Sequence, residues 1–149
     1  MNRDKIKEIL PHREPMLLVD EAELKDSVAI GKYTVRGDEW FLKGHFPGNP
    51  VVPGVILCEM MAQSACPLLL QHAGKKSTPY FTGLDKVRFK NSVSPGDVIE
   101  FTCTLTAKKG PFYFVQGQGR VGDKLCVAGD FSFAVLSNKE SEKSERNGN

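Results

Sequence analysis

The chain contains 149 residues, a length typical of one domain with a sizeable hydrophobic core. Hydrophobic residues make up 40% of the sequence and charged residues 26%, an ordinary balance that argues against global disorder. The formal net charge is only +2, whereas nucleic-acid-binding domains usually concentrate far more lysine and arginine, so we do not expect nucleic acid as a partner.

The N-terminal third of the chain predicts a short helix followed by two strands. Residues 2–9 read as the helix, which Pro11 stops. The segments 16–24 and 27–35 are rich in apolar residues and predict the strands. In the second strand the apolar phase slips by one near Gly31, which predicts a bulge or a sharp bend there.

The central third combines a loop rich in glycine and proline with a long apolar helix. The loop covers residues 37–53, and the helix is predicted over residues 54–71. Pro53 stands near the first turn, where proline is tolerated. Apolar residues lie all round this helix, so we expect it at the centre of the protein. Pro67 should kink or loosen its last turn.

Strands dominate the rest of the chain. They are predicted over residues 80–90, 97–109, 112–121 and 125–136, with turns that contain glycine between the later ones. The second of these strands alternates cleanly between apolar and polar residues, as expected for a half-buried antiparallel strand. Residues 137–149 are charged and hold no large apolar residue, so we predict a disordered tail.

Cysteine usage and hydropathy favour a cytoplasmic protein. The four cysteines lack the CxxC or Cys/His spacing of a zinc site, so no metal is predicted. The N-terminus lacks the apolar core of a signal peptide, and we therefore expect free thiols in a reducing compartment. The longest apolar stretch, residues 51–70, is interrupted by polar residues and two prolines, so we do not expect it to span a membrane.

Together these elements predict one α+β domain over residues 1–136. It would contain one long helix and an antiparallel sheet of about six strands curved around that helix. One sheet cannot cover every side of an apolar helix. We therefore expect a second copy of the chain to help, which makes the protein a homo-oligomer.

Two residues with catalytic potential, His45 and Glu59, stand 14 positions apart. Glu59 interrupts the apolar helix, and Gln63 lies one turn further on the same face. Burial favours the neutral form of a carboxyl group, which can then serve as a general acid. The alternative is a structural glutamate satisfied by Gln63 or by a backbone donor. His45 lies in a loop that prolines stiffen; it is either a fixed base or an imidazole bonded to a backbone carbonyl.

The start of the predicted helix offers a third feature. The first N–H groups of a helix have no internal partner and suit an anion, and Gly54 has no side chain to block its approach. An enolate-like oxygen could be stabilised there. A base, an acid and an oxyanion donor together favour proton abstraction next to a carbonyl group.

Three segments resemble a known family. They are LPHREPMLLVD (10–20), GHFPGNPVVPGVILCEMMAQ (44–63) and YFTGLDKVRFKNSVSPGD (80–97), and they resemble the β-hydroxyacyl-acyl carrier protein dehydratases of bacterial type II fatty acid synthesis. The resemblance runs from about residue 5 to residue 136. It implies a hot-dog fold, in which a sheet wraps a central helix. It also implies a dimer, commonly assembled as a trimer of dimers, whose active sites combine His45 of one subunit with Glu59 of the other.

The resemblance also implies a role for each site residue. His45 would remove a C2 proton from a β-hydroxyacyl thioester, and Glu59, directly or through a water, would protonate the departing hydroxyl group. The supporting positions would be the Gly54 N–H holding the thioester oxygen, the Val51 carbonyl orienting the imidazole, Gln63 orienting Glu59, and Tyr80 lining and gating an acyl tunnel. The substrate would arrive on acyl carrier protein, and no metal or organic cofactor is implied.

Other positions are open to two interpretations. Lys86, Arg88 and Lys90 alternate on a predicted strand and form either a docking patch for an acidic carrier protein or a solvated strand face. His12 and Arg13 begin a motif shared with the family, and we interpret them as residues that fix local structure.

The sequence departs from the family at two places. Glu14 stands where an aromatic residue is common, and Cys66–Pro67 where small or apolar helix formers are expected. Both departures could alter the tunnel end and the acyl-length preference.

Three other functions remain open on the same fold. A thioesterase would use the helix carboxylate to activate water and would have no need of His45. A bifunctional enzyme would also isomerise the double bond. A non-catalytic acyl-thioester sensor usually needs a DNA-binding segment, for which residues 1–10 are too short.

Overall fold

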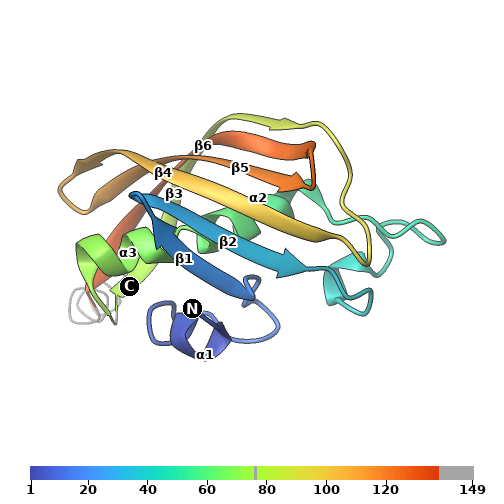
Figure 1. Cartoon of the computed structure of the whole chain (residues 1–149), viewed down its shortest axis with the longest axis horizontal. Coiled ribbons are helices and arrows are strands. Elements are labelled where there is room, and N and C mark those ends of the chain that lie inside the picture. Colours follow the sequence, from blue (N-terminus) through green and yellow to red (C-terminus); the bar gives the residue numbers. More distant parts are fainter. Residues whose placement is uncertain (76, 138–149) are drawn as a thin grey trace, which may run out of the picture.

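The computed structural model describes residues 1–75 and 77–137, and its main feature is a six-stranded antiparallel sheet. The strands are β1 (Glu21–Lys25), β2 (Val28–Thr34), β3 (Ser77–Phe89), β4 (Val98–Lys109), β5 (Phe112–Val121) and β6 (Lys124–Ser137), in the spatial order β1-β2-β4-β5-β6-β3 (Figure 1). The helices are α1 (Arg3–Ile6), α2 (Gly54–Gln63) and α3 (Cys66–Ala73), with a 3-10 turn at Trp40–Leu42.

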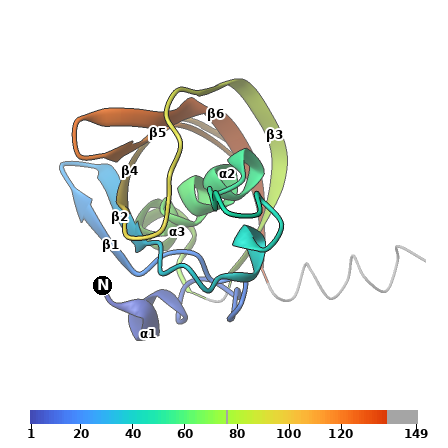
Figure 2. The ribbon, with the colours of Figure 1, turned by 90° about the vertical axis from the view of Figure 1, so that its right-hand side faces the viewer.

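The sheet curves around α2, as the end-on view in Figure 2 shows. The curve runs from β1 over β5 and β6 to β3, and α1 lies beneath the open side. The predicted α+β fold, one sheet wrapped around a central helical segment, is therefore confirmed. The two edge strands, β1 and β3, lie at opposite ends of the curve.

The central helix is interrupted at its middle, where the sequence predicted only a loosened last turn. Two helices, α2 and α3, are separated at Ser64 and Ala65. Pro67 lies in the first turn of α3, has no N–H to offer the carbonyl of Gln63, and its ring would crowd that carbonyl in a continuous helix. The Ser64 hydroxyl donates to the carbonyl of Met60 over 2.8 Å, a bond that also tends to bend helices.

Strand β2 lacks the bulge that was predicted near Gly31. Its register with both neighbours is unbroken from Val28 to Thr34, and Ala29, Gly31 and Tyr33 alternate on the buried face. Gly31 has a different reason to be glycine. A Cβ atom there would collide with the side chain of Ser64 and lie 2.9 Å from its Cα, so sheet and helix interruption touch at this point.

The strand predicted over residues 16–24 begins only at Glu21. Leu17, Leu18 and Val19 before it are buried, but the backbone of Met16 and Leu18 pairs with a side chain and not with a strand. The Gln63 amide donates to the carbonyl of Met16 over 2.8 Å and accepts from the N–H of Leu18 over 2.7 Å. Gln63 thus takes the place of a neighbouring strand.

Strand β4 follows the predicted alternation. In β4, Ile99, Phe101 and Cys103 are buried while their neighbours face outward. Strand β3 begins at Ser77, three residues earlier than predicted, and two register shifts interrupt its pairing with β6. Strand β6 reaches Ser137, one residue past the predicted domain end. The rest of the predicted tail, residues 138–149, lies outside the described residues.

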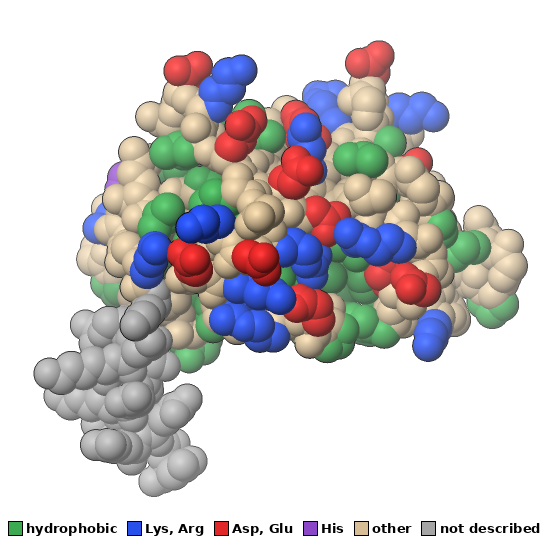
Figure 3. Space-filling view, turned by 60° about the horizontal axis from the view of Figure 1, so that its bottom comes forward, with side chains coloured by type: hydrophobic (Ala, Val, Ile, Leu, Met, Phe, Trp, Pro, Cys, Tyr) green, Lys and Arg blue, Asp and Glu red, His purple; other side chains and the backbone are tan. Residues whose placement is uncertain are grey.

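The helical segment Gly54–Ala73 is long and apolar enough to cross a membrane by length and composition, but 67% of its most apolar window is buried inside the protein. Burial by its own sheet is what a core helix requires. All four cysteines are buried and free. On the face shown in Figure 3, basic and acidic side chains are interspersed, and no large area carries one sign of charge.

Candidate active site

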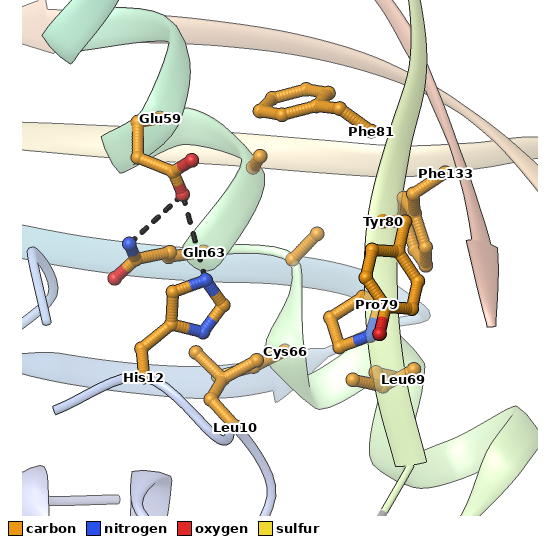
Figure 4. Close-up of a pocket in the computed structure, with 12 residues that line it drawn as sticks. Leu10, His12, Glu59, Gln63, Cys66, Leu69, Pro79, Tyr80, Phe81 and Phe133 are labelled. Atoms are coloured by element: carbon orange, nitrogen blue, oxygen red, sulfur yellow. Dashed lines mark hydrogen bonds and ion pairs between the residues drawn. The ribbon is translucent and has the colours of Figure 1, made fainter. Parts of the chain in front are cut away.

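A cavity of about 170 Å³ opens between α2, β3 and the segment that follows α1 (Figure 4). Its polar side chains are Glu59, Gln63, His12 and Tyr80. Most of the remaining wall is apolar, with contributions from Leu69, Phe81 and Phe133. An apolar cavity with a few convergent polar groups is the usual form of a small-molecule site.

Glu59 is held by Gln63, one helical turn further along α2. The Gln63 amide donates to Glu59 Oε2 over 2.9 Å. Its orientation is fixed because the Leu18 N–H can only donate and the Met16 carbonyl can only accept. The backbone of residues 16–18 therefore fixes the orientation of the Gln63 amide, and this amide in turn fixes the position of the Glu59 carboxyl group.

The carboxyl group of Glu59 is less buried than the sequence indicated. Its side chain is 23% exposed, because the cavity opens beside it. The helix around it is buried as predicted, with Met60 and Met61 fully enclosed. Glu59 thus faces a site that a ligand can enter.

His45 lies in the loop before α2 and is held by the backbone. Its Nδ1 lies 3.0 Å from the carbonyl of Val51, and the Val51 N–H donates to the His45 carbonyl over 2.9 Å. A carbonyl can only accept, so Nδ1 carries the proton and Nε2 is left as the basic nitrogen. The ring also stacks on Phe46, with the two centroids 4.3 Å apart.

The structure does not bring all the predicted residues into one cavity. Glu59, Gln63 and Tyr80 line it, whereas His45 and Val51 are absent from the described residues that form its wall. Within a single chain, the candidate base is therefore not part of the wall of the cavity that the candidate acid lines.

Gly54 is the first residue of α2, as the oxyanion prediction requires. A Cβ atom at this position would come within 2.9 Å of the ring of Phe89. Because Phe89 is 53% exposed and the contact is with the outer end of its ring, the ring can shift, and packing alone does not require glycine here. The role of the Gly54 N–H stays a prediction.

Tyr80 and the basic residues of β3 lie near the outer edge of the sheet. Tyr80 is 45% exposed at the cavity. Lys86, Arg88 and Lys90 are all exposed, but a register shift between Asp85 and Arg88 breaks the simple alternation on which the predicted patch was based. Lys90 lies just beyond the end of β3.

Of the four polar side chains named above, His12 is the one that the sequence did not place in the site. The sequence motif indicates a residue that fixes local structure, yet the Nε2 of His12 lies 3.8 Å from Glu59 Oε2 (Figure 4). Burial lowers the pKa of His12, the charge of Arg13 acts in the same direction, and the Glu59 carboxylate opposes both. The available signal was its membership of the HREP motif.

The cysteines near the site are poor nucleophiles. Burial raises the pKa of Cys66, which lines the cavity, to about 12, and burial also raises the pKa of Cys58. Both thiols stay protonated near neutral pH. Within residues 1–75 and 77–137, no group of three or more His, Cys, Asp or Glu side chains is placed to hold a metal ion.

Comparison with known proteins links this chain to one group of enzymes. A family model described as a FabA-like domain matches residues 10–130. The 3-hydroxyacyl-[acyl-carrier-protein] dehydratase FabZ of Clostridium perfringens (strain SM101 / Type A) is 42% identical over 137 residues, which are 91% of this chain and 99% of that protein. The protein of the same name from Caldicellulosiruptor bescii is 44% identical over 137 residues, covering 90% of this chain and 98% of that protein.

Solved structures show the same fold at lower identity. A chain of the dehydratase heterocomplex ApeI:P from Xenorhabdus doucetiae superposes with a TM-score of 0.77 at 22% identity, covering 93% of this chain and 95% of its own. The fluoroacetyl-CoA thioesterase FlK superposes with a TM-score of 0.69 at 12% identity, covering 87% of this chain and 99% of its own. The sheet wrapped around a helix is thus the hot-dog fold, which carries more than one chemistry.

Proposed function

This chain belongs to the FabA-like family and, within it, to the 3-hydroxyacyl-[acyl-carrier-protein] dehydratases, and from that premise we propose that it converts (3R)-hydroxyacyl-acyl carrier protein to the trans-2-enoyl product in fatty acid biosynthesis. Membership makes the chain a hydro-lyase. The observation that carries the proposal is the match to dehydratases at 42% and 44% identity over nearly their whole length. The acting unit would be a single domain, residues 1–136, in the cytoplasm.

In the proposed reaction His45 is the base. Its Nε2 removes a proton from C2 of the acyl chain, and the hydrogen bond from Nδ1 to Val51 supports the imidazolium that forms. The electron pair moves onto the thioester oxygen to give an enolate-like intermediate. The first N–H groups of α2, including that of Gly54, would donate hydrogen bonds to this oxygen.

Glu59 is the proposed acid. Its proton passes, directly or through a water, to the C3 hydroxyl group. The protonated hydroxyl group leaves as water while the C2–C3 double bond forms. Gln63 donates to Oε2, which favours Oε1 as the oxygen that exchanges the proton. The apolar wall beyond Glu59 fits the acyl chain, and exposed Tyr80 would gate the entry of that chain.

We further propose that a second copy of the chain completes the site. In one chain Glu59 lines the cavity and His45 does not. In addition, β3 is an edge strand with exposed apolar side chains: Phe81 is 43% exposed, Leu84 50% and Phe89 53%. Val55, close to His45 in sequence, is 75% exposed. Pairing of two such edges would bury these side chains. The trimer of dimers implied by the resemblance stays a prediction.

The deciding experiment uses the purified protein with β-hydroxybutyryl and crotonyl thioesters of acyl carrier protein. We expect interconversion of the two thioesters without release of free thiol. Release of thiol without interconversion would identify a thioesterase and exclude the proposed function. A shift of the double bond from C2–C3 to C3–C4 would reveal additional isomerase activity.

Variants test the two proposed catalytic residues. We expect His45→Ala and Glu59→Gln each to lower kcat by roughly 100-fold or more, because each removes a proton-transfer group. Exposed residues of the same types provide the controls, and His72→Ala and Glu100→Gln should stay close to wild type. Unchanged interconversion in either site variant would refute the assignment.

A further inference from the structure

His12 has an arrangement that a merely structural residue does not need. It follows the first helix, yet its ring points into the cavity toward Glu59 (Figure 4). The distance of 3.8 Å between Nε2 and Oε2 is slightly too long for a direct hydrogen bond. Such a gap closes with a small side-chain movement or is bridged by one water.

The other ring nitrogen of His12 is enclosed. Among the described residues, Nδ1 is the buried side-chain nitrogen or oxygen atom that has no hydrogen-bond partner. Placing a proton on it would bury an unpaired N–H group, and a charged ring would add a desolvation cost. The geometry therefore favours a neutral ring with its proton on Nε2, the nitrogen that faces Glu59.

A neutral donor is what an acid at Glu59 requires. An imidazolium beside the carboxyl group would form an ion pair and hold Glu59 ionised. A neutral Nε2–H leaves Glu59 free to take up a proton, and it still stabilises the carboxylate that remains when the proton has left. Both neighbours, His12 and Gln63, approach the same oxygen, Oε2.

The backbone of His12 is fixed independently. The Arg13 guanidinium donates to three carbonyls of the segment: Leu10 over 3.0 Å, His12 over 2.7 Å and Lys7 over 3.2 Å. Arg13 therefore holds the loop. The imidazole ring of His12 is not needed to hold the loop and is available to interact with Glu59 in the cavity. The two residues of this motif therefore have different roles.

We propose that His12 is a positioning residue for Glu59: a neutral imidazole whose Nε2–H, together with the Gln63 amide, holds Oε2 and leaves Oε1 to exchange the proton. This assignment rests on the proposed dehydratase function. The titratable groups that share the cavity with His12 are Glu59, Cys66 and Tyr80, and Arg13 is its charged neighbour in the chain.

The first test reads the ring directly and needs no activity. In ¹⁵N NMR spectra of the oligomer at pH 7, the shifts of the ring nitrogens report which of them carries the proton. The chain has three histidines, and loss of one signal set in a His12→Gln variant assigns His12. We expect a neutral ring protonated on Nε2, whose Nε2 signal moves in Glu59→Gln while the His72 signals stay in place.

The second test uses a matched pair of substitutions. A glutamine amide can reach the position of the histidine Nε2, whereas the shorter asparagine amide reaches only that of Nδ1. We expect His12→Asn to lower kcat by roughly 10- to 100-fold with KM nearly constant, because a misplaced acid slows the chemical step. His12→Gln should restore kcat to within about threefold of wild type, since the donor returns uncharged.

Each outcome decides the proposal. A proton on Nδ1, a charged ring at pH 7, wild-type kcat in His12→Asn, or equal loss in both variants would overturn it. If His12→Asn fails to fold, the NMR measurement on wild type and Glu59→Gln still decides. Absence of dehydratase activity in the wild-type protein would count against the proposed function, whereas the NMR result would still establish or exclude the neutral donor.

Discussion

The position of Glu59 is set through a chain of hydrogen bonds at the residue scale. The backbone of Met16 and Leu18 fixes the Gln63 amide, and the amide fixes the carboxyl group. The i to i+4 spacing predicted the contact between Gln63 and Glu59 from sequence. The backbone partners could not be predicted, because the apolar run 16–19 is equally typical of a paired strand.

Removal of the Gln63 amide should therefore cost stability as well as activity. In Gln63→Leu the Leu18 N–H and the Met16 carbonyl lose their partner inside the protein, which we expect to destabilise the fold by roughly 2–4 kcal/mol. Urea unfolding at fixed protein concentration measures the change. Gln71→Leu, on the exposed side of α3, is the control and should change stability by less than about 0.5 kcal/mol. Equal effects would contradict the role given to Gln63.

The lowered pKa of His12 predicts a pH dependence of stability. Burial lowers the pKa of this ring from its ordinary 6.5, so unfolding takes up a proton. The stabilisation is complete above pH 6.5 and is lost as the pH falls through the lower pKa of the folded state. Urea titrations from about pH 7 to about pH 5 should therefore show a shallower decline in His12→Gln than in wild type. Parallel declines would contradict the burial of the ring.

Glu14 should act in a different pH range. The hydrogen bond from Lys7 lowers the pKa of this carboxyl group to about 2, and Arg3 adds to the effect. Its stabilisation is therefore present above its ordinary value of 4.5 and is lost only as the pH falls toward 2.

At the scale of elements, alternation and turn residues predicted most of the sheet, and tertiary contacts explain the errors. Strands β4, β5 and β6 could be predicted because apolar residues recur at about every second position along them. The helix interruption lies at Ser64, which packs against Gly31 of β2, and periodicity alone could predict neither this contact nor the unbroken register of β2. The hydrophobic phase slips in the sequence because Val28 and Ile30, on the less buried face of β2, are apolar, whereas buried Gly31 has no side chain.

Gly31 offers a direct test of that contact. Gly31→Ala places a methyl group against the Ser64 side chain and backbone, so we expect a loss of roughly 1–3 kcal/mol or more in unfolding free energy. Gly83→Ala on β3 is the control, because its Cβ would meet only the Ser132 hydroxyl at 3.1 Å. A Gly31→Ala variant as stable as Gly83→Ala would show that β2 and the interruption are not tightly packed.

At the scale of the whole molecule, the sequence located the catalytic candidates but not the distance between them. The motif and its spacing pointed to His45 and Glu59, and the resemblance implied that they meet across two subunits. In the structure of one chain, Glu59 lines the cavity and His45 does not. The charge distribution also matters at this scale, because a carrier protein would bind the surface of the whole assembly.

The basic residues of β3 are the predicted carrier contact. Lys86→Glu and Arg88→Glu should raise KM for a carrier-linked substrate by roughly tenfold at low salt, because charge speeds encounter with an acidic protein. Turnover of a short free thioester should change little. Lys25→Glu on β1, the opposite edge strand, makes the same charge change and is the control. Equal effects on both substrates would argue for a solvated strand face.

The central claim, a site built from His45 of one copy and Glu59 of another, is tested most directly by mixing two inactive chains. When His45→Ala and Glu59→Gln chains are co-expressed in equal amounts, each mixed dimer has one intact site, and random pairing should restore about one quarter of wild-type activity. Replacing the Glu59→Gln chain with the double variant should restore none. Activity no higher than that of the separate parents would contradict the account, since it would place both residues at work within one chain.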